Sequence, residues 1–109
     1  MKFDPRWDVL EEKYCEHSGH YESLFALANG YLGTRGATEE GYRVRIPGTY
    51  LAGLFDAVPR EVTELPNLPD WLNVELELAG ERFDLSQGKI LDYHRILHLY
   101  DGVLVRTVR

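Results

Sequence analysis

The spacing of its glycines constrains this chain more than any other feature of the sequence. Residues 22–41 are here called the glycine-rich segment. They contain an apolar run, Leu24–Ala28, which is followed by four glycines: Gly30, Gly33, Gly36 and Gly41. Glycine at such intervals marks positions where the backbone needs a positive φ or a very close approach to another segment. We therefore expect bends or bulges between early strands, with Gly33→Val damaging solubility or folding.

A phosphate-binding loop is the alternative interpretation of these glycines. Dinucleotide-binding loops read Gly-x-Gly-x-x-Gly and open directly into a helix, and P-loops end in Gly-Lys-Ser/Thr. The spacing Gly30-x-x-Gly33-x-x-Gly36 matches neither pattern, and a further glycine soon follows. The spacing favours a structural role.

Composition places the chain among soluble globular proteins. It has 109 residues, 44% of them hydrophobic, which suits one small domain or a piece of a larger one. The net charge of −6 disfavours binding to nucleic acid or to an anionic membrane surface. A single cysteine, Cys15, and a start without an apolar stretch indicate a reducing, cytoplasmic location.

The order of elements predicts a mainly β, antiparallel fold. Residues 6–14 fit a strand or a short helix, and residues 42–46 alternate as a strand that would place Arg43 and Arg45 on its solvated face. Residues 49–55 form a further expected strand. Three prolines predict an irregular connection over residues 57–70.

Two hairpins are expected in the second half. Residues 74–78 predict a strand with Val74, Leu76 and Leu78 on a buried face, followed by a turn at 79–81 and a strand at 82–85. Asp101-Gly102 is a type I′ turn signal between two alternating runs. A two-residue loop there predicts three cross-strand pairs on the buried face: Tyr100 with Val103, His98 with Val105 and Ile96 with Thr107. The opposite face is half apolar and is expected to pack as well.

The last of these strands runs to the final residue, Arg109, without a polar tail. Because domains usually end in such a tail or in a tied-down element, we expect the chain to be a fragment.

Few residues suggest chemistry. Cys15, His17 and His20 have zinc-ligand side chains, but structural zinc sites usually show two paired ligand spacings, so a polar surface loop is favoured and no metal is expected. Three carboxylate pairs are expected to lie on the solvated surface: Glu11/Glu12, Glu39/Glu40 and Glu75/Glu77. No catalytic or cofactor-binding residue is assigned.

Aromatic side chains could instead stack on sugar rings. Trp71 follows Pro69-Asp70 in an expected loop, and Tyr50 is the second such candidate. Both residue types are more often half-buried than sugar-binding.

Several motifs together resemble a known family, glycoside hydrolase family 65, which contains maltose, trehalose and kojibiose phosphorylases. Residues 22–36 are similar to the family's first glycine-rich segment, with Asn29, Gly30, Gly33, Arg35 and Gly36 as its structural signature. Ala28 departs mildly, since many members have glycine there. Four more segments match in order: residues 47–56, 64–72, 80–84 and 90–95.

The resemblance implies an amino-terminal antiparallel β-sandwich, of which residues 1–109 are a part. It also implies a following (α/α) barrel, absent from this chain, that holds the general-acid glutamate and the phosphate site. Inorganic phosphate, or water in hydrolytic members, would attack the anomeric carbon of an α-linked glucose disaccharide with inversion. No family catalytic residue maps onto these 109 positions, so we expect the chain alone to be inactive.

Two other hypotheses concern partners. A stand-alone carbohydrate-binding or interaction module is the alternative function. A half-sandwich also leaves strand edges open, so we expect a homo-oligomer, detectable by light scattering.

Overall fold

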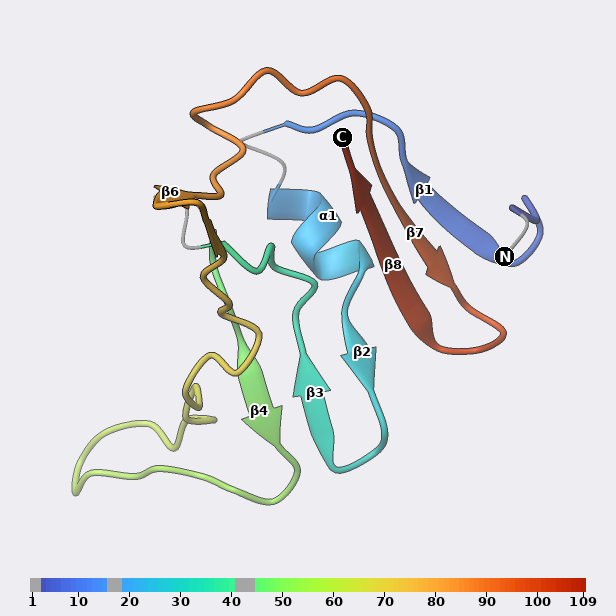
Figure 1. Ribbon diagram of the computed structural model, residues 1–109. Helices are drawn as coiled ribbons and strands as arrows, with labels where there is room; N and C mark the ends of the chain where they lie inside the picture. Colours follow the sequence, from blue (N-terminus) through green and yellow to red (C-terminus); the bar gives the residue numbers. More distant parts are fainter. Residues whose placement is uncertain (1–2, 16–18, 41–44) are drawn as a thin grey trace.

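The described part of the chain forms short antiparallel strands and one short helix (Figure 1). This computed structural model describes residues 3–15, 19–40 and 45–109. In chain order the elements are β1 (Asp8–Glu11), α1 (Gly19–Leu24), β2 (Leu27–Ala28), β3 (Leu32–Thr34), β4 (Thr49–Leu51), β5 (Glu77–Leu78), β6 (Glu81–Arg82), β7 (Tyr93–His98) and β8 (Val103–Val108). The predicted mainly β, antiparallel class is confirmed.

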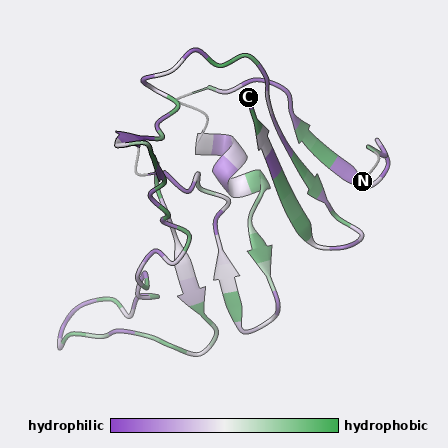
Figure 2. Ribbon diagram, viewed as in Figure 1, coloured by the Kyte–Doolittle hydropathy of each residue, from purple (hydrophilic) through white to green (hydrophobic). Residues whose placement is uncertain are grey.

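The first sheet joins the two ends of the chain. Its order is β1-β7-β8, and β1 pairs antiparallel with β7 from Asp8 opposite His98 to Glu11 opposite Arg95. Of the two possibilities open for residues 6–14, the structure has the strand. Figure 2 shows that β8 is mostly apolar, whereas β1 and β7 mix apolar with hydrophilic residues.

The β7–β8 hairpin forms, but its predicted register is wrong by two residues. His98 pairs with Val103 and Ile96 with Val105, across a loop of residues 99–102. A two-residue type I′ turn needs positive φ at both central residues, and only Gly102 adopts it, at 64°. The Gly102 N–H instead donates to the His98 carbonyl at 2.8 Å, which closes the longer loop.

The predicted buried face of this hairpin is only partly right: His98 on it is buried, but the opposite face, which was expected to pack as well, carries more of the burial. Tyr93, Arg95 and Leu97 are buried on one side of β7, whereas Val103 and Val105 on the other side of the hairpin are exposed. Period-2 alternation separates the faces but does not say which one is covered. The arginine-bearing face turns inward because its guanidinium groups meet carboxylates there.

The second sheet is built from the glycine-rich segment and the strand after it. Its order is β2-β3-β4, with Ala28 opposite Gly33 and Gly33 opposite Tyr50. Helix α1 lies between this sheet and the first (Figure 1). Phe25 follows the helix and is buried, with Ala37, Leu85, Tyr93 and Leu97 as the other buried hydrophobic residues.

Strand β5 is shorter than predicted. Ala79 and Gly80 both have positive φ, at 54° and 82°, so the predicted turn into β6 is confirmed. The predicted buried face is not: Val74, Leu76 and Leu78 are exposed. Nothing among the described residues packs over them closely enough to cover them.

Residues 57–70 form an irregular connection, as predicted. Residues 52–66, here called the arm, leave the end of β4 and project beyond the second sheet (Figure 1). Among residues 3–15, 19–40 and 45–109, no helix has the length and apolar character required to cross a membrane. The predicted strand at 42–46 lies mostly outside the described residues, and so does Arg43.

Candidate functional site

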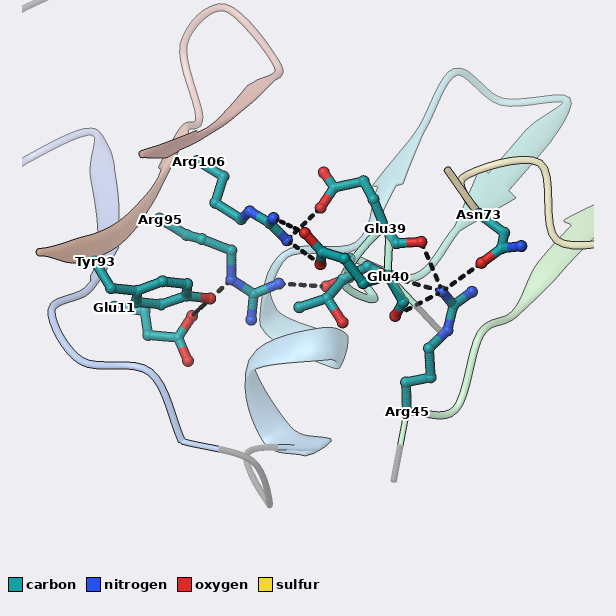
Figure 3. Close-up of polar contacts among 10 residues, drawn as sticks. Glu11, Glu39, Glu40, Arg45, Asn73, Tyr93, Arg95 and Arg106 are labelled. Carbon is teal, nitrogen blue, oxygen red and sulfur yellow. Dashed lines mark hydrogen bonds and ion pairs between the residues drawn. The ribbon is translucent and has the colours of Figure 1, made fainter. Parts of the chain in front are cut away.

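A cleft opens between the two three-stranded sheets. Its volume is about 440 Å³, and its lining is mostly apolar. β2 and β3 contribute Leu27 and Leu32, β8 contributes Leu104, and Phe25 and Trp71 complete the apolar wall. Charged side chains reach it as well, chiefly Arg95, Arg106 and Glu39, which belong to a buried network (Figure 3).

Arg95 is the centre of the first part of this network. Its Nε donates to Glu11 Oε2 at 2.6 Å and its Nη1 to the Gly36 carbonyl at 2.7 Å. The guanidinium also lies 4.8 Å from the centroid of the Phe25 ring, within cation–π range. Arg95 is 3% exposed and Glu11 1%, so this group ties β1, β7 and the glycine-rich segment together in the interior.

Arg106 binds the two glutamates that lie between Gly36 and Gly41. Its Nη1 donates to Glu39 Oε2 at 2.5 Å and to Glu40 Oε2 at 2.7 Å. Burial alone would lower the pKa of the guanidinium, but the hydrogen bond to Glu40 and the charges of both glutamates raise it above its usual value. Arg106 therefore stays charged and paired.

Arg45 completes the network from the opposite side (Figure 3). Its Nη1 donates to the carbonyls of Thr38 and Glu39, at 2.8 and 3.2 Å, and its side chain pairs with Asp70. The expectation that Arg45 lies on a solvated face is wrong, because its guanidinium is buried. Glu11 and Glu40 were also expected at the solvated surface, and this is wrong because both are buried. Glu75 and Glu77 are exposed, as expected.

These arginines stabilise the fold and are poorly suited to chemistry. A guanidinium cannot act as a general acid or base near neutral pH. Each of Arg45, Arg95 and Arg106 already neutralises a carboxylate, so an anion would have to displace a glutamate or aspartate. The three arginines bind residues 36–40 from three sides and fix the two sheets relative to each other.

Tyr93 makes the stability of the network depend on pH in the alkaline range. Its hydroxyl donates to Glu11 Oε2 at 3.3 Å. Burial raises the pKa of this phenol above its ordinary value of 10.0, and the nearby Arg95 charge only partly offsets the rise. The stabilisation is complete below about pH 10, where the unfolded chain also keeps its proton, and it is lost as the pH rises towards the folded-state pKa.

We therefore expect Tyr93→Phe to flatten the alkaline loss of stability. Between pH 8 and pH 11 the variant should lose about 1 kcal/mol less free energy of unfolding than the parent chain. Urea unfolding at both pH values measures this. Tyr100→Phe, at an exposed tyrosine, is the control, and equal slopes for Tyr93→Phe and the parent chain would contradict the prediction.

The signature residues have distinct structural positions. Asn29 Oδ1 accepts from the backbone N–H groups of Tyr31 and Leu32, at 3.0 and 2.9 Å, and so shapes the β2–β3 turn. Gly30 in that turn has φ 90°, a value that disfavours residues with a side chain. Arg35 Nε donates to the Ile46 carbonyl at 2.9 Å and its Nη1 to Ser23 Oγ at 2.9 Å.

The close approach in this segment is at Gly36. A Cβ there would lie 2.5 Å from Phe25 Cβ and 2.7 Å from the Phe25 carbonyl oxygen. At Gly33, within β3, an added Cβ would meet only Ala28 Cβ at an ordinary 3.6 Å. The steric argument therefore applies to Gly36 more strongly than to Gly33.

The two sugar-stacking candidates lie apart. Trp71 is 59% exposed and lines the cleft, whereas Tyr50 lies on β4 and is not part of the cleft wall. The structure thus brings Trp71 alone to the cleft, and stacking stays a prediction.

The potential zinc cluster falls partly outside the described residues, because His17 is not among them. Cys15 is exposed, and the His20 ring packs on Tyr21 with centroids 4.2 Å apart. The described part of the chain holds no group of three or more metal-ligating side chains.

Sequence reasoning missed the buried arginine network. One signal was available: Arg95 shares a strand face with Tyr93 and Leu97, and a charge on such a face requires a buried partner. The partner itself, Glu11, lies 84 residues away and could not be identified from spacing.

Comparison with known proteins gives one consistent result. Residues 9–109 match the N-terminal domain of glycosyl hydrolase family 65. The chain is 50% identical over 103 residues to kojibiose phosphorylase from Halothermothrix orenii, covering 94% of this chain and 13% of that protein. It is 33% identical over 119 residues to alpha,alpha-trehalose phosphorylase from Thermoanaerobacter brockii, covering 94% and 15% respectively.

A solved structure shows the same fold. It is a candidate kojibiose phosphorylase from the human microbiome, with a TM-score of 0.83 and 25% identity. The alignment covers 94% of this chain and 15% of that one. The chain thus spans about a seventh of the length of the proteins it resembles.

Proposed function

Since the chain belongs to glycosyl hydrolase family 65 as its N-terminal domain, we propose that it is the non-catalytic amino-terminal part of an enzyme acting on α-linked glucose disaccharides. The match over residues 9–109, at about a seventh of the relatives' length, carries this proposal. In the full-length parent, inorganic phosphate or water would attack the anomeric carbon in a separate catalytic barrel. No cofactor is proposed.

The role of the chain in such an enzyme would be scaffolding. Its buried arginines are bound to carboxylates and carbonyls of the same chain, which supports a structural role for the network. The cleft, and the outer edge of β8, with which no strand of the described residues pairs, favour contact with further polypeptide, including a second copy of the chain. The single exposed cysteine supports a cytoplasmic location.

An activity assay tests the proposal. We expect no glucose 1-phosphate when the 109-residue chain is incubated with kojibiose, maltose or trehalose in the presence of phosphate, because no described cluster combines a free general acid with a phosphate site. The Halothermothrix orenii kojibiose phosphorylase, assayed with kojibiose, is the positive control. Release of glucose 1-phosphate by the chain alone would overturn a non-catalytic role.

A sugar-binding module is the second candidate. The exposed ring of Trp71 at the cleft favours it, since an apolar platform beside polar groups suits a sugar ring. The mostly apolar wall of the cleft and its paired charges weigh against it. A measurable affinity for these disaccharides in calorimetry, lost in Trp71→Ala, would favour this role over scaffolding.

A further inference from the structure

The arm, residues 52–66, exposes more apolar surface than its own chain can cover. Five large hydrophobic side chains along it are exposed: Leu54, Phe55, Val58, Val62 and Leu65. Phe55 is 61% exposed and Val62 81%. The arm projects past the ends of the strands in Figure 1, and apolar segments recur along it in Figure 2. Exposed apolar side chains concentrated on one projection mark an interaction surface.

The arm is nevertheless ordered by its own contacts. Asp56 and Glu64 exchange backbone hydrogen bonds of 2.9 Å in each direction, and the Glu61 N–H donates to the Val58 carbonyl at 3.0 Å to close the turn. At the base, Asn67 Oδ1 accepts from the Thr49 N–H at 2.9 Å, and its Nδ2 donates to the Pro47 carbonyl at 3.1 Å.

Such order matters for binding. Pro59 and Pro66 also fix φ within the arm. A segment held in one conformation before binding loses less conformational entropy when it docks. The arm therefore has the properties of a preformed contact element.

Charge indicates the kind of partner. The arm carries three carboxylates, Asp56, Glu61 and Glu64, against one cation, Arg60. The whole chain has a net charge of −6, so a second copy would meet the arm with like charge. An apolar surface flanked by basic side chains is the complementary partner.

We propose that the arm docks onto the part of a family 65 polypeptide that lies beyond the matched residues, in an apolar depression flanked by basic side chains. The relatives carry about six-sevenths of their length outside the match, so most of their surface lies there. This inference rests on the proposed function, because it needs the chain to be one domain of a larger enzyme.

A chimera tests the arm in a complete enzyme. This chain replaces the matched 103 residues of the Halothermothrix orenii kojibiose phosphorylase, and phosphorolysis of kojibiose is followed during heating. The double variant Phe55→Ser/Val62→Ser should inactivate about tenfold faster than the unsubstituted chimera, because apolar anchors of an interface are removed. In the 109-residue chain alone, the same variant should leave the melting temperature unchanged.

The matched control removes equally exposed apolar side chains elsewhere. Tyr31→Ser/Leu91→Ser, at residues 78% and 67% exposed, should change the chimera's inactivation rate little. The proposal would be overturned if the arm variant inactivated no faster on heating than the unsubstituted chimera, or no faster than this control variant. A lower melting temperature of the isolated chain with the arm variant would also overturn the proposal. If the isolated chain self-associates in sedimentation and the arm variant abolishes this, a second copy of the chain would be identified as the occupant instead.

The proposed function fails by a different result. An unsubstituted chimera without kojibiose phosphorolysis would show that this chain cannot serve as the amino-terminal domain, and the arm would lose its partner with it. If the chimera is active but the arm substitutions do not change its rate of inactivation on heating, only the docking inference would be overturned.

Discussion

Arg95→Met is expected to cost about 3–5 kcal/mol of the free energy of unfolding, which is the usual penalty for removing one partner of a buried ion pair. The variant leaves the Glu11 carboxylate charged in the interior and the Gly36 carbonyl without this donor. Because small domains have only about 5–15 kcal/mol in total, most of the stability of the chain would be lost. Urea unfolding followed by circular dichroism measures the change.

Two further variants separate burial from charge. Arg82→Met removes an exposed pair with Glu75, 2.8 Å long, and should cost no more than about 1 kcal/mol. Glu11→Leu combined with Arg95→Met removes both charges of this buried pair and should recover much of the loss. If Arg95→Met were as mild as Arg82→Met, the network would not be the support that its burial indicates.

Gly36→Ala is the second substitution expected to be severe, at about 3 kcal/mol. The new methyl group would overlap the backbone of Phe25, so the end of α1 and residue 36 would have to separate. Two contacts would stretch as they part: the Gly36 N–H to the Glu22 carbonyl at 2.8 Å, and the Gly36 carbonyl to Arg95 at 2.7 Å. The midpoint of thermal unfolding reports the effect.

Gly33→Ala is the natural control, three residues earlier in the same segment. Its added Cβ fits beside Ala28, and alanine is generally favoured over glycine within a strand. The variant should match the parent chain or exceed it slightly in stability. A loss at Gly33 equal to that at Gly36 would mean that the glycine requirement is not the close approach to Phe25.

Local sequence signals predicted much of the fold. Alternation located β7 and β8, the Ala79-Gly80 pair located a turn, and prolines marked the irregular connection. These features depend on backbone preferences within a few residues. Among the signature glycines, Gly30 has a positive φ and Gly36 lies against Phe25, but the motif alone does not distinguish Gly36 from Gly33.

The charged interior could not be predicted in the same way. Glu11 and Glu40 sit in acidic pairs that usually face solvent, and only the distant arginines Arg95 and Arg106 make their burial possible. The choice of buried face on the β7–β8 hairpin follows from those same pairs. Long-range pairing decided both, and no pattern within one strand contains it.

The pairing of β1 with β7 also sets the order in which this sheet can assemble. Strand β1 lies at residues 8–11 and its partner at residues 93–98, so a loop of about eighty residues must close before they meet. On a ribosome adding about 5–20 residues per second, β1 would wait several seconds for its partner. The β7–β8 hairpin is local and can form first. The first strand to be made is therefore the last to enter its sheet.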